Sequence, residues 1–187
     1  METYLFDMND TIVDSSIYEK MHWELIRALA GHTGKEEAEL RKLMSEIREG
    51  AGTEKTDSFD LSKNLNATEL YYKILEKYAR HEFALKTKSI PEIFRKIKSK
   101  GKKIGIVSSS QPRTIEIFLG RFGLMEYVDF IEAGKKDTVL FWVTLAKKHN
   151  IFPETAIVID DSSAILAIAK RAGYNVLNAE NIKDLEI

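Results

Sequence analysis

The chain has 187 residues, of which 30% are charged, with a formal net charge of −1 and no cysteine. A chain of this length can bury the core of one domain, or of one domain with a small insertion, without disulfides. The lack of cysteine excludes disulfide bridges, thiolate metal sites and a cysteine nucleophile, and the near-zero net charge gives no general attraction to nucleic acids or anionic membranes.

The chain shows no pattern for crossing a membrane or for export. No apolar run approaches the ~20 residues that span a bilayer. An apolar run begins at residue 4, with no charged leader or cleavage site before it. We therefore expect a cytoplasmic protein that binds neither membranes nor nucleic acid.

The first predicted element is a short strand at residues 4–6, because the run is apolar, aromatic and followed by turn-forming residues. Asp7 comes next, ahead of the polar turn Asn9-Asp10-Thr11. Ligands of open parallel α/β sheets bind outside the carboxyl ends of the strands. Asp7 is therefore a candidate functional residue, although an aspartate at this position could also be a helix cap or a turn former.

Residues 15–84 have helical patterns and no strand alternation. One apolar stripe contains Met21, Leu25 and Leu29, and two others lie around residues 40–47 and 70–78. Within this segment, residues 50–65 are rich in Gly, Thr, Asp, Ser and Asn, which predicts a loop. The segment reads as an all-helical insertion after the first strand.

From residue 85 onward, strands and helices alternate. Apolar runs predict strands at residues 103–107 and 156–159, with a weaker one at 128–131, and Pro112 is suited to the first turn of a helix. This alternation predicts a doubly wound parallel sheet of the α/β class.

Three further polar segments follow predicted strands. Ser108-Ser109-Ser110 could hold a phosphoryl group or cap a helix. Gly134-Lys135-Lys136-Asp137 offers two lysines, which elsewhere would be surface residues. Asp160-Asp161 places two carboxylates at a buried strand end, which is costly unless a cation pairs with them, and Mg²⁺ prefers such oxygen ligands.

These four segments, in this order, resemble the signatures of the haloacid dehalogenase superfamily. The first signature in that family is Asp-x-Asp-Gly-Thr-Leu/Val-x-Asp after an apolar strand, and the chain matches it at Asp7, Thr11, Val13 and Asp14. Two positions depart from it. Asn9 stands in place of the second aspartate, and Asp10 stands in place of the usual glycine.

The other three segments also resemble family signatures. Ser108 corresponds to the serine or threonine of the second signature, and Asp161 takes the metal-ligand place of the fourth. The third resembles a Gly-Lys-Pro-x-Pro segment, without its prolines. Its spacing to Phe141 favours Lys135 over Lys136 as the functional lysine.

The resemblance implies a fold and a division into domains. Residues 1–14 and 85–187 would form a Rossmann-like catalytic core, and residues 15–84 would form a helical cap. A helical subdomain that stabilises the edge of the sheet is the alternative for the second segment.

The resemblance also implies a Mg²⁺-dependent phosphatase-like hydrolase of a small phosphorylated metabolite. Asp7 would form an aspartyl-phosphate, and Mg²⁺ would be held by Asp7, Asp161 and the backbone carbonyl of Asn9. Ser108, Ser109 and Lys135 would hold the phosphate oxygens.

Asn9 bears directly on this mechanism, because its side chain has no carboxyl group to protonate a leaving group or activate water. The chain could be a weak or specialised enzyme, a variant that traps its ligand, or a non-catalytic phospholigand-binding or regulatory protein. Asp10 could substitute for the missing carboxylate, but adjacent side chains usually diverge.

Overall fold

The computed structural model describes residues 2–51, 58–80, 84–185 and 187. The chain divides into two compact units, one formed by Met1–Asp14 with Glu82–Ile187 and the other by Ser15–His81. No helix in the described part of the chain combines the length and apolar character needed to cross a membrane.

The first unit contains a five-stranded sheet in the order β3-β2-β1-β4-β5, and every neighbouring pair is parallel. The strands are β1 (Thr3–Phe6), β2 (Lys103–Ser108), β3 (Phe130–Ala133), β4 (Ala156–Asp160) and β5 (Asn175–Asn178). This confirms the predicted doubly wound parallel sheet. The expected weak strand lies two residues further along the chain than predicted, and β5 was not predicted.

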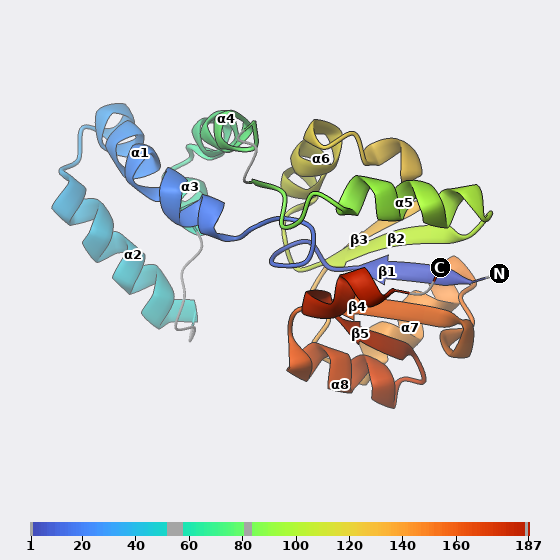
Figure 1. The fold of residues 1–187 in the computed structure, drawn as a ribbon. Coiled ribbons are helices and arrows are strands. Elements are labelled where there is room, and N and C mark those ends of the chain that lie inside the picture. The colour runs from blue at the N-terminus through green and yellow to red at the C-terminus, as the bar shows by residue number, and fades with distance from the viewer. Residues whose placement is uncertain (1, 52–57, 81–83, 186) are drawn as a thin grey trace. The chain divides into compact units, whose positions relative to one another are not determined.

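Helices cover both faces of this sheet (Figure 1). They are α5 (Ile90–Ser99) and α6 (Pro112–Arg121) on one face, and α7 (Val139–His149) and α8 (Ser163–Arg171) on the other. The described part of this unit after residue 89 also contains three short 3-10 turns, at Met125–Tyr127, Pro153–Thr155 and Ala179–Asp184.

Alternation along the central strand explains why both faces are covered. Leu5 packs with residues of α7 and α8 in one buried cluster, whereas the ring of Phe6 lies 4.7 Å from that of Phe94 on α5. Successive side chains of a strand point to opposite faces, so a strand that is apolar throughout needs a layer on each side. All four residues of β1 are buried.

The second unit consists of helices α1 (Ser16–Thr33), α2 (Glu37–Ala51), α3 (Ser58–Asn64) and α4 (Thr68–Tyr78) in its described part. The predicted stripe of Met21, Leu25 and Leu29 is buried on α1. The loop predicted at residues 50–65 is wrong for 58–64, which form α3, and residues 52–57 lie outside the described part of the chain. Burial of Phe59 and Leu61 stabilises that helix despite its polar composition.

The sheet topology determines where a ligand would bind. The chain leaves β1 toward β2 and β3 on one side, then crosses over to β4 and β5 on the other. Connections from β1 and β4 therefore run in opposite directions, which opens a crevice at their carboxyl ends. Asp7 directly follows β1, and Asp160 is the last residue of β4.

Candidate active site

Asp7 is held at the end of β1 by the neighbouring strand, because its backbone N–H donates to the carbonyl of Ile159 at 2.9 Å. The chain then folds into a tight turn, in which the N–H groups of Ile12 and Val13 both donate to the carbonyl of Met8 at 2.8 Å. The turn keeps the Asp7 carboxylate at the strand end, where it is 7% exposed.

Asp10 adopts a left-handed backbone conformation in this turn, with φ of 54°. Glycine adopts this conformation without strain, and aspartate is one of the few other residues that tolerate it. This geometry explains why glycine is usual at this position in the family signature. The carboxylate of Asp10 accepts a hydrogen bond from Lys86 at 3.2 Å, and Asn9 and Asp10 line the same pocket although they are adjacent.

Lys136 lies between two buried carboxylates. Its ammonium nitrogen is 2.5 Å from Asp7 Oδ1 and 2.5 Å from Asp160 Oδ2. The other oxygen of Asp160 accepts from the N–H of Ser162 at 2.9 Å. The Lys136 side chain is only 8% exposed, so its charge is compensated by partners at short range, as a buried charge requires.

This result corrects the predicted lysine. Lys136 approaches Asp7, whereas Lys135 is exposed, although it lines the same pocket. The expected aromatic spacing does not separate the two, because Trp142 lies as far after Lys136 as Phe141 lies after Lys135. The indole Nε1 of the buried Trp142 donates to the backbone carbonyl of Lys136 at 3.0 Å, which fixes Lys136 in its inward position.

Burial raises the pKa of Asp7 to about 6, and this effect is only partly opposed by the charge of Lys136, while Asp160 raises the pKa further. Burial and the charge of Asp160 also raise the pKa of Asp161. Both shifts arise because negative charges are crowded and partly removed from water. A bound cation would relieve this repulsion.

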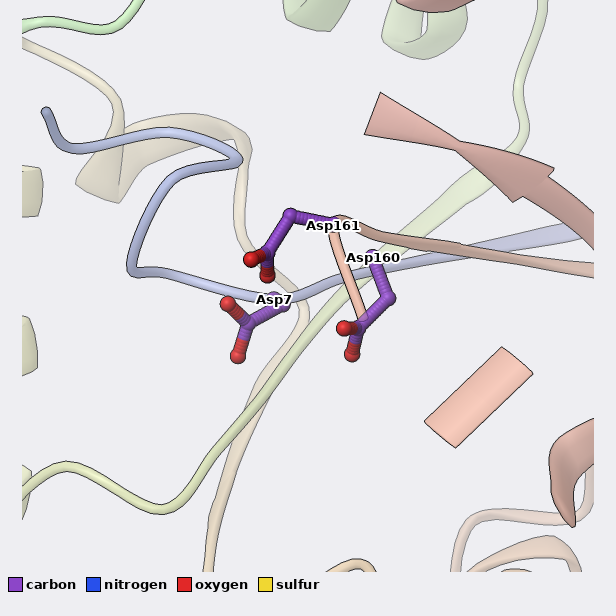
Figure 2. A group of neighbouring side chains, drawn as sticks. All are labelled: Asp7, Asp160 and Asp161. Carbon is purple, nitrogen blue, oxygen red and sulfur yellow. The ribbon is translucent and has the colours of Figure 1, made fainter. Parts of the chain in front are cut away.

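Asp7, Asp160 and Asp161 each offer a carboxylate oxygen, and these atoms lie within 4.8 Å of one another (Figure 2). Oxygen-only donors that include one or two carboxylates are typical of Mg²⁺ sites. The donor set therefore fits Mg²⁺. Asp160 also pairs with Lys136, and Asp161 is the exposed member of the group.

The predicted serines take different positions. Ser108 is buried at the end of β2, and its hydroxyl accepts from the N–H of Ser110 at 3.2 Å. Ser109 is exposed and lines the pocket. The side-chain amide of Asn9 donates to the hydroxyl of Ser110 at 3.3 Å, a contact that the sequence gave no reason to expect.

These side chains surround a pocket of about 390 Å³ within the first unit. Its lining consists of Asp7, Asn9, Asp10, Ser109, Lys135, Lys136, Asp137, Asp160, Asp161, Ser162 and Ile165. Of the residues predicted for the site, the structure brings Asp7, Asn9, Ser109, Lys135 and Asp161 to the pocket. Ser108 is buried and is not among the lining residues.

Comparison with known proteins gives one family. A family model for haloacid dehalogenase-like hydrolases matches residues 4–179. A phosphorylated carbohydrates phosphatase from Thermotoga maritima is 25% identical over 97% of this chain and 88% of its own length.

Solved structures show the same fold. A phosphatase from Thermococcus onnurineus superposes with a TM-score of 0.69 at 23% identity, covering 94% of this chain and 85% of that one. A mutant of CbbY from Rhodobacter sphaeroides, in complex with xylulose-(1,5)bisphosphate, gives a TM-score of 0.66 at 21% identity, covering 95% and 85%.

Proposed function

The chain belongs to the haloacid dehalogenase-like hydrolase family, and on that premise we propose that it hydrolyses small phosphate monoesters through an aspartyl-phosphate at Asp7. The observation that carries this proposal is a strand-end carboxylate in contact with a buried lysine and beside two further carboxylates. The name of the Thermotoga relative supports a phosphorylated carbohydrate as the substrate class.

Asp7 is suited to nucleophilic attack because a carboxyl with a pKa of about 6 is mostly ionised at neutral pH and needs no base to activate it. Attack on phosphorus forms the bond between Asp7 and the phosphoryl group and breaks the bond to the leaving oxygen, which takes a proton from solvent to become the alcohol. Water then cleaves the acyl phosphate, which releases inorganic phosphate and regenerates Asp7.

Lys136 takes the role that the sequence gave to Lys135. Its ammonium group donates a hydrogen bond to the Asp7 carboxylate, so it would reduce the repulsion between the nucleophile and the incoming phosphoryl oxygens. We propose that Ser108 and Ser109 assist by binding these oxygens. Ser109 lines the pocket, whereas Ser108 is buried and does not line it, so Ser109 would make the more direct contact.

Asp7, Asp161 and the backbone carbonyl of Asn9 would hold Mg²⁺. When bound, the ion supplies positive charge that offsets the repulsion between a carboxylate nucleophile and a phosphate dianion. Asp160 would contribute indirectly, because both of its oxygens already have partners in Lys136 and Ser162.

We further propose that the helical unit Ser15–His81 acts as a cap that contributes to substrate selection. A second candidate function is non-catalytic binding of a phosphorylated ligand. Asn9 favours it, because a site without an acid–base carboxylate at this position can bind a phosphate ester without turning it over efficiently.

Release of inorganic phosphate from p-nitrophenyl phosphate and a panel of sugar phosphates, with and without Mg²⁺, tests the proposal. Asp7→Asn should abolish the Mg²⁺-dependent activity, whereas Glu116→Gln, at an exposed residue on α6, serves as a matched control. Activity that persists in Asp7→Asn would remove Asp7 as the nucleophile. Tight binding of a panel member without turnover by the wild type would favour the second candidate.

A further inference from the structure

Lys135 is a positively charged residue of the pocket that has no role in the proposed mechanism. It is exposed and lines the pocket together with Asp7. Among the residues that the structure describes, no carboxylate lies within ion-pair distance of its ammonium group. Lys136, the other lysine of the lining, is shared between two carboxylates.

The backbone on either side of Lys135 is fixed by hydrogen bonds. The N–H of Gly134 donates to the carbonyl of Ser108 at 2.8 Å, and Trp142 holds the carbonyl of Lys136. The flexible side chain of Lys135 therefore starts from an anchored backbone. Inward placement of Lys136 leaves Lys135 as the exposed lysine of the pocket lining.

The charged residues that line the pocket indicate which part of a substrate Lys135 could bind. Five aspartates and two lysines line the pocket, and the lysine at the nucleophile is already neutralised by its partners. The reacting phosphoryl group must sit at Asp7, next to Lys136. Because Lys136 makes the contact with Asp7, the exposed Lys135 is available to another part of the substrate.

We propose that Lys135 is a specificity-determining residue that binds a second anionic group of the substrate. The substrate class would then be a phosphate monoester whose remaining part carries a further phosphate or a carboxylate. This inference rests on the proposed function, because it assumes that the reacting phosphoryl group lies at Asp7. The shared chemistry is a second negative charge, and the two sources can be separated with chosen probes.

The test compares fructose 1,6-bisphosphate and 2-phosphoglycolate, which carry a second anionic group, with glucose 6-phosphate, which does not. Lys135→Gln should lower kcat/KM for the first two relative to glucose 6-phosphate by about five- to tenfold, between the effects typical of an exposed ion pair and of a hydrogen bond to a charged group. Lys135→Arg should restore most of the preference. Lys147→Gln, at an exposed lysine on α7 outside this pocket, should leave it unchanged.

If Lys135→Gln loses only the preference for fructose 1,6-bisphosphate, the recognised group is a phosphate. If it loses only the preference for 2-phosphoglycolate, the recognised group is a carboxylate. An equal loss for all three probes would mean that Lys135 acts on the reacting phosphoryl group, which overturns the inference, and no change for any probe does the same.

Calorimetry separates this inference from the proposed function. If the wild type releases phosphate neither from these probes nor from p-nitrophenyl phosphate and the sugar phosphate panel, the proposed function fails. Tighter binding of fructose 1,6-bisphosphate than of glucose 6-phosphate, lost in Lys135→Gln, would still support recognition of a second anionic group. Equal affinity for both, or no binding of the bisphosphate, overturns it.

Discussion

Asn9→Asp should convert the site into a more active phosphatase. The amide and carboxylate are nearly isosteric, and the Asn9 side chain already lines the pocket together with Asp7. The Ser110 hydroxyl, which accepts from the amide at 3.3 Å, can rotate to donate to a carboxylate instead. Asn9→Asp should therefore preserve the fold and place a carboxyl group beside the reacting centre.

Positioned acid–base catalysis contributes typically ~10²–10⁴-fold, or roughly 3–5 kcal/mol of barrier. Because five aspartates already line this pocket, negative charge nearby would raise the pKa of the new carboxyl and help it to act as an acid. We expect a gain in kcat of at least about tenfold, a threshold set below the low end of that range.

The assay is steady-state phosphate release from an alkyl phosphate and from an aryl phosphate. The gain should be larger for the alkyl substrate, because an alkoxide needs protonation on leaving, whereas a phenolate barely does. Asn9→Ala, which removes the amide without adding a carboxyl, should show no gain. Unchanged turnover of both substrates by Asn9→Asp would refute the assignment of position 9 as the missing acid–base.

Three further predictions concern the charged cluster. Lys136→Met leaves Asp7 and Asp160 buried without their cation, so the free energy of unfolding at pH 7 should fall by about 3–5 kcal/mol in urea denaturation, whereas Lys135→Met should change it by less than about 0.5 kcal/mol. The pKa of Asp7 is raised in the folded state to about 6 from 3.8, so the folded protein binds the proton more tightly than the unfolded chain does. The free energy of unfolding of the metal-free protein should therefore fall as pH rises from about 4 to 6, by up to about 3 kcal/mol. Asp7→Asn should lack this part of the pH dependence. Asp161→Asn should weaken Mg²⁺ binding in calorimetry more than Asp137→Asn does, and equal affinity in Asp161→Asn and wild type would exclude Asp161 as a direct ligand.

The sequence predicted the parts of the site that depend on strand ends. Asp7 and Asp161 could be placed because a buried parallel strand is a short continuous apolar run, and the carboxyl ends of parallel strands meet at one edge. The edge strand β5 was missed because its apolar run is only two residues long, Val176 and Leu177, with an asparagine at each end. Helix α3 was missed because its stability comes from packing, including contacts of the Phe59 ring with Tyr71 and Tyr72 at 5.4 and 5.9 Å.

The choice between Lys135 and Lys136 depended on contacts that the sequence does not encode locally. Each lysine is followed at the same spacing by an aromatic residue. The difference is that Trp142 is fully buried and Phe141 is not, because α7 turns Trp142 toward the sheet. A helical-face analysis that included Trp142 with Leu145 and Ala146, the buried face of α7, would have favoured Lys136.

Asn9 and Asp10 both line the pocket, and Asp10 has a positive φ. Their side chains have different partners, because Asn9 donates to Ser110 and Asp10 accepts from Lys86, as expected of adjacent residues. The carboxylate of Asp10 is paired with Lys86 at 3.2 Å. This contact directs it to Lys86, so its presence in the pocket does not replace the carboxyl that Asn9 lacks.

On the proposed mechanism, the two halves of the reaction are affected unequally. The groups that would form the aspartyl-phosphate are in contact, because Lys136 lies on Asp7 and the carboxylate of Asp161 is nearby. Its hydrolysis needs a base to activate water, the role that Asn9 cannot fill. A substrate with a good leaving group should therefore phosphorylate Asp7 faster than water removes the phosphate. Mass spectrometry of the intact wild type, quenched in acid after mixing with acetyl phosphate and Mg²⁺, should detect a phosphorylated form that is absent in Asp7→Asn and depleted in Asn9→Asp.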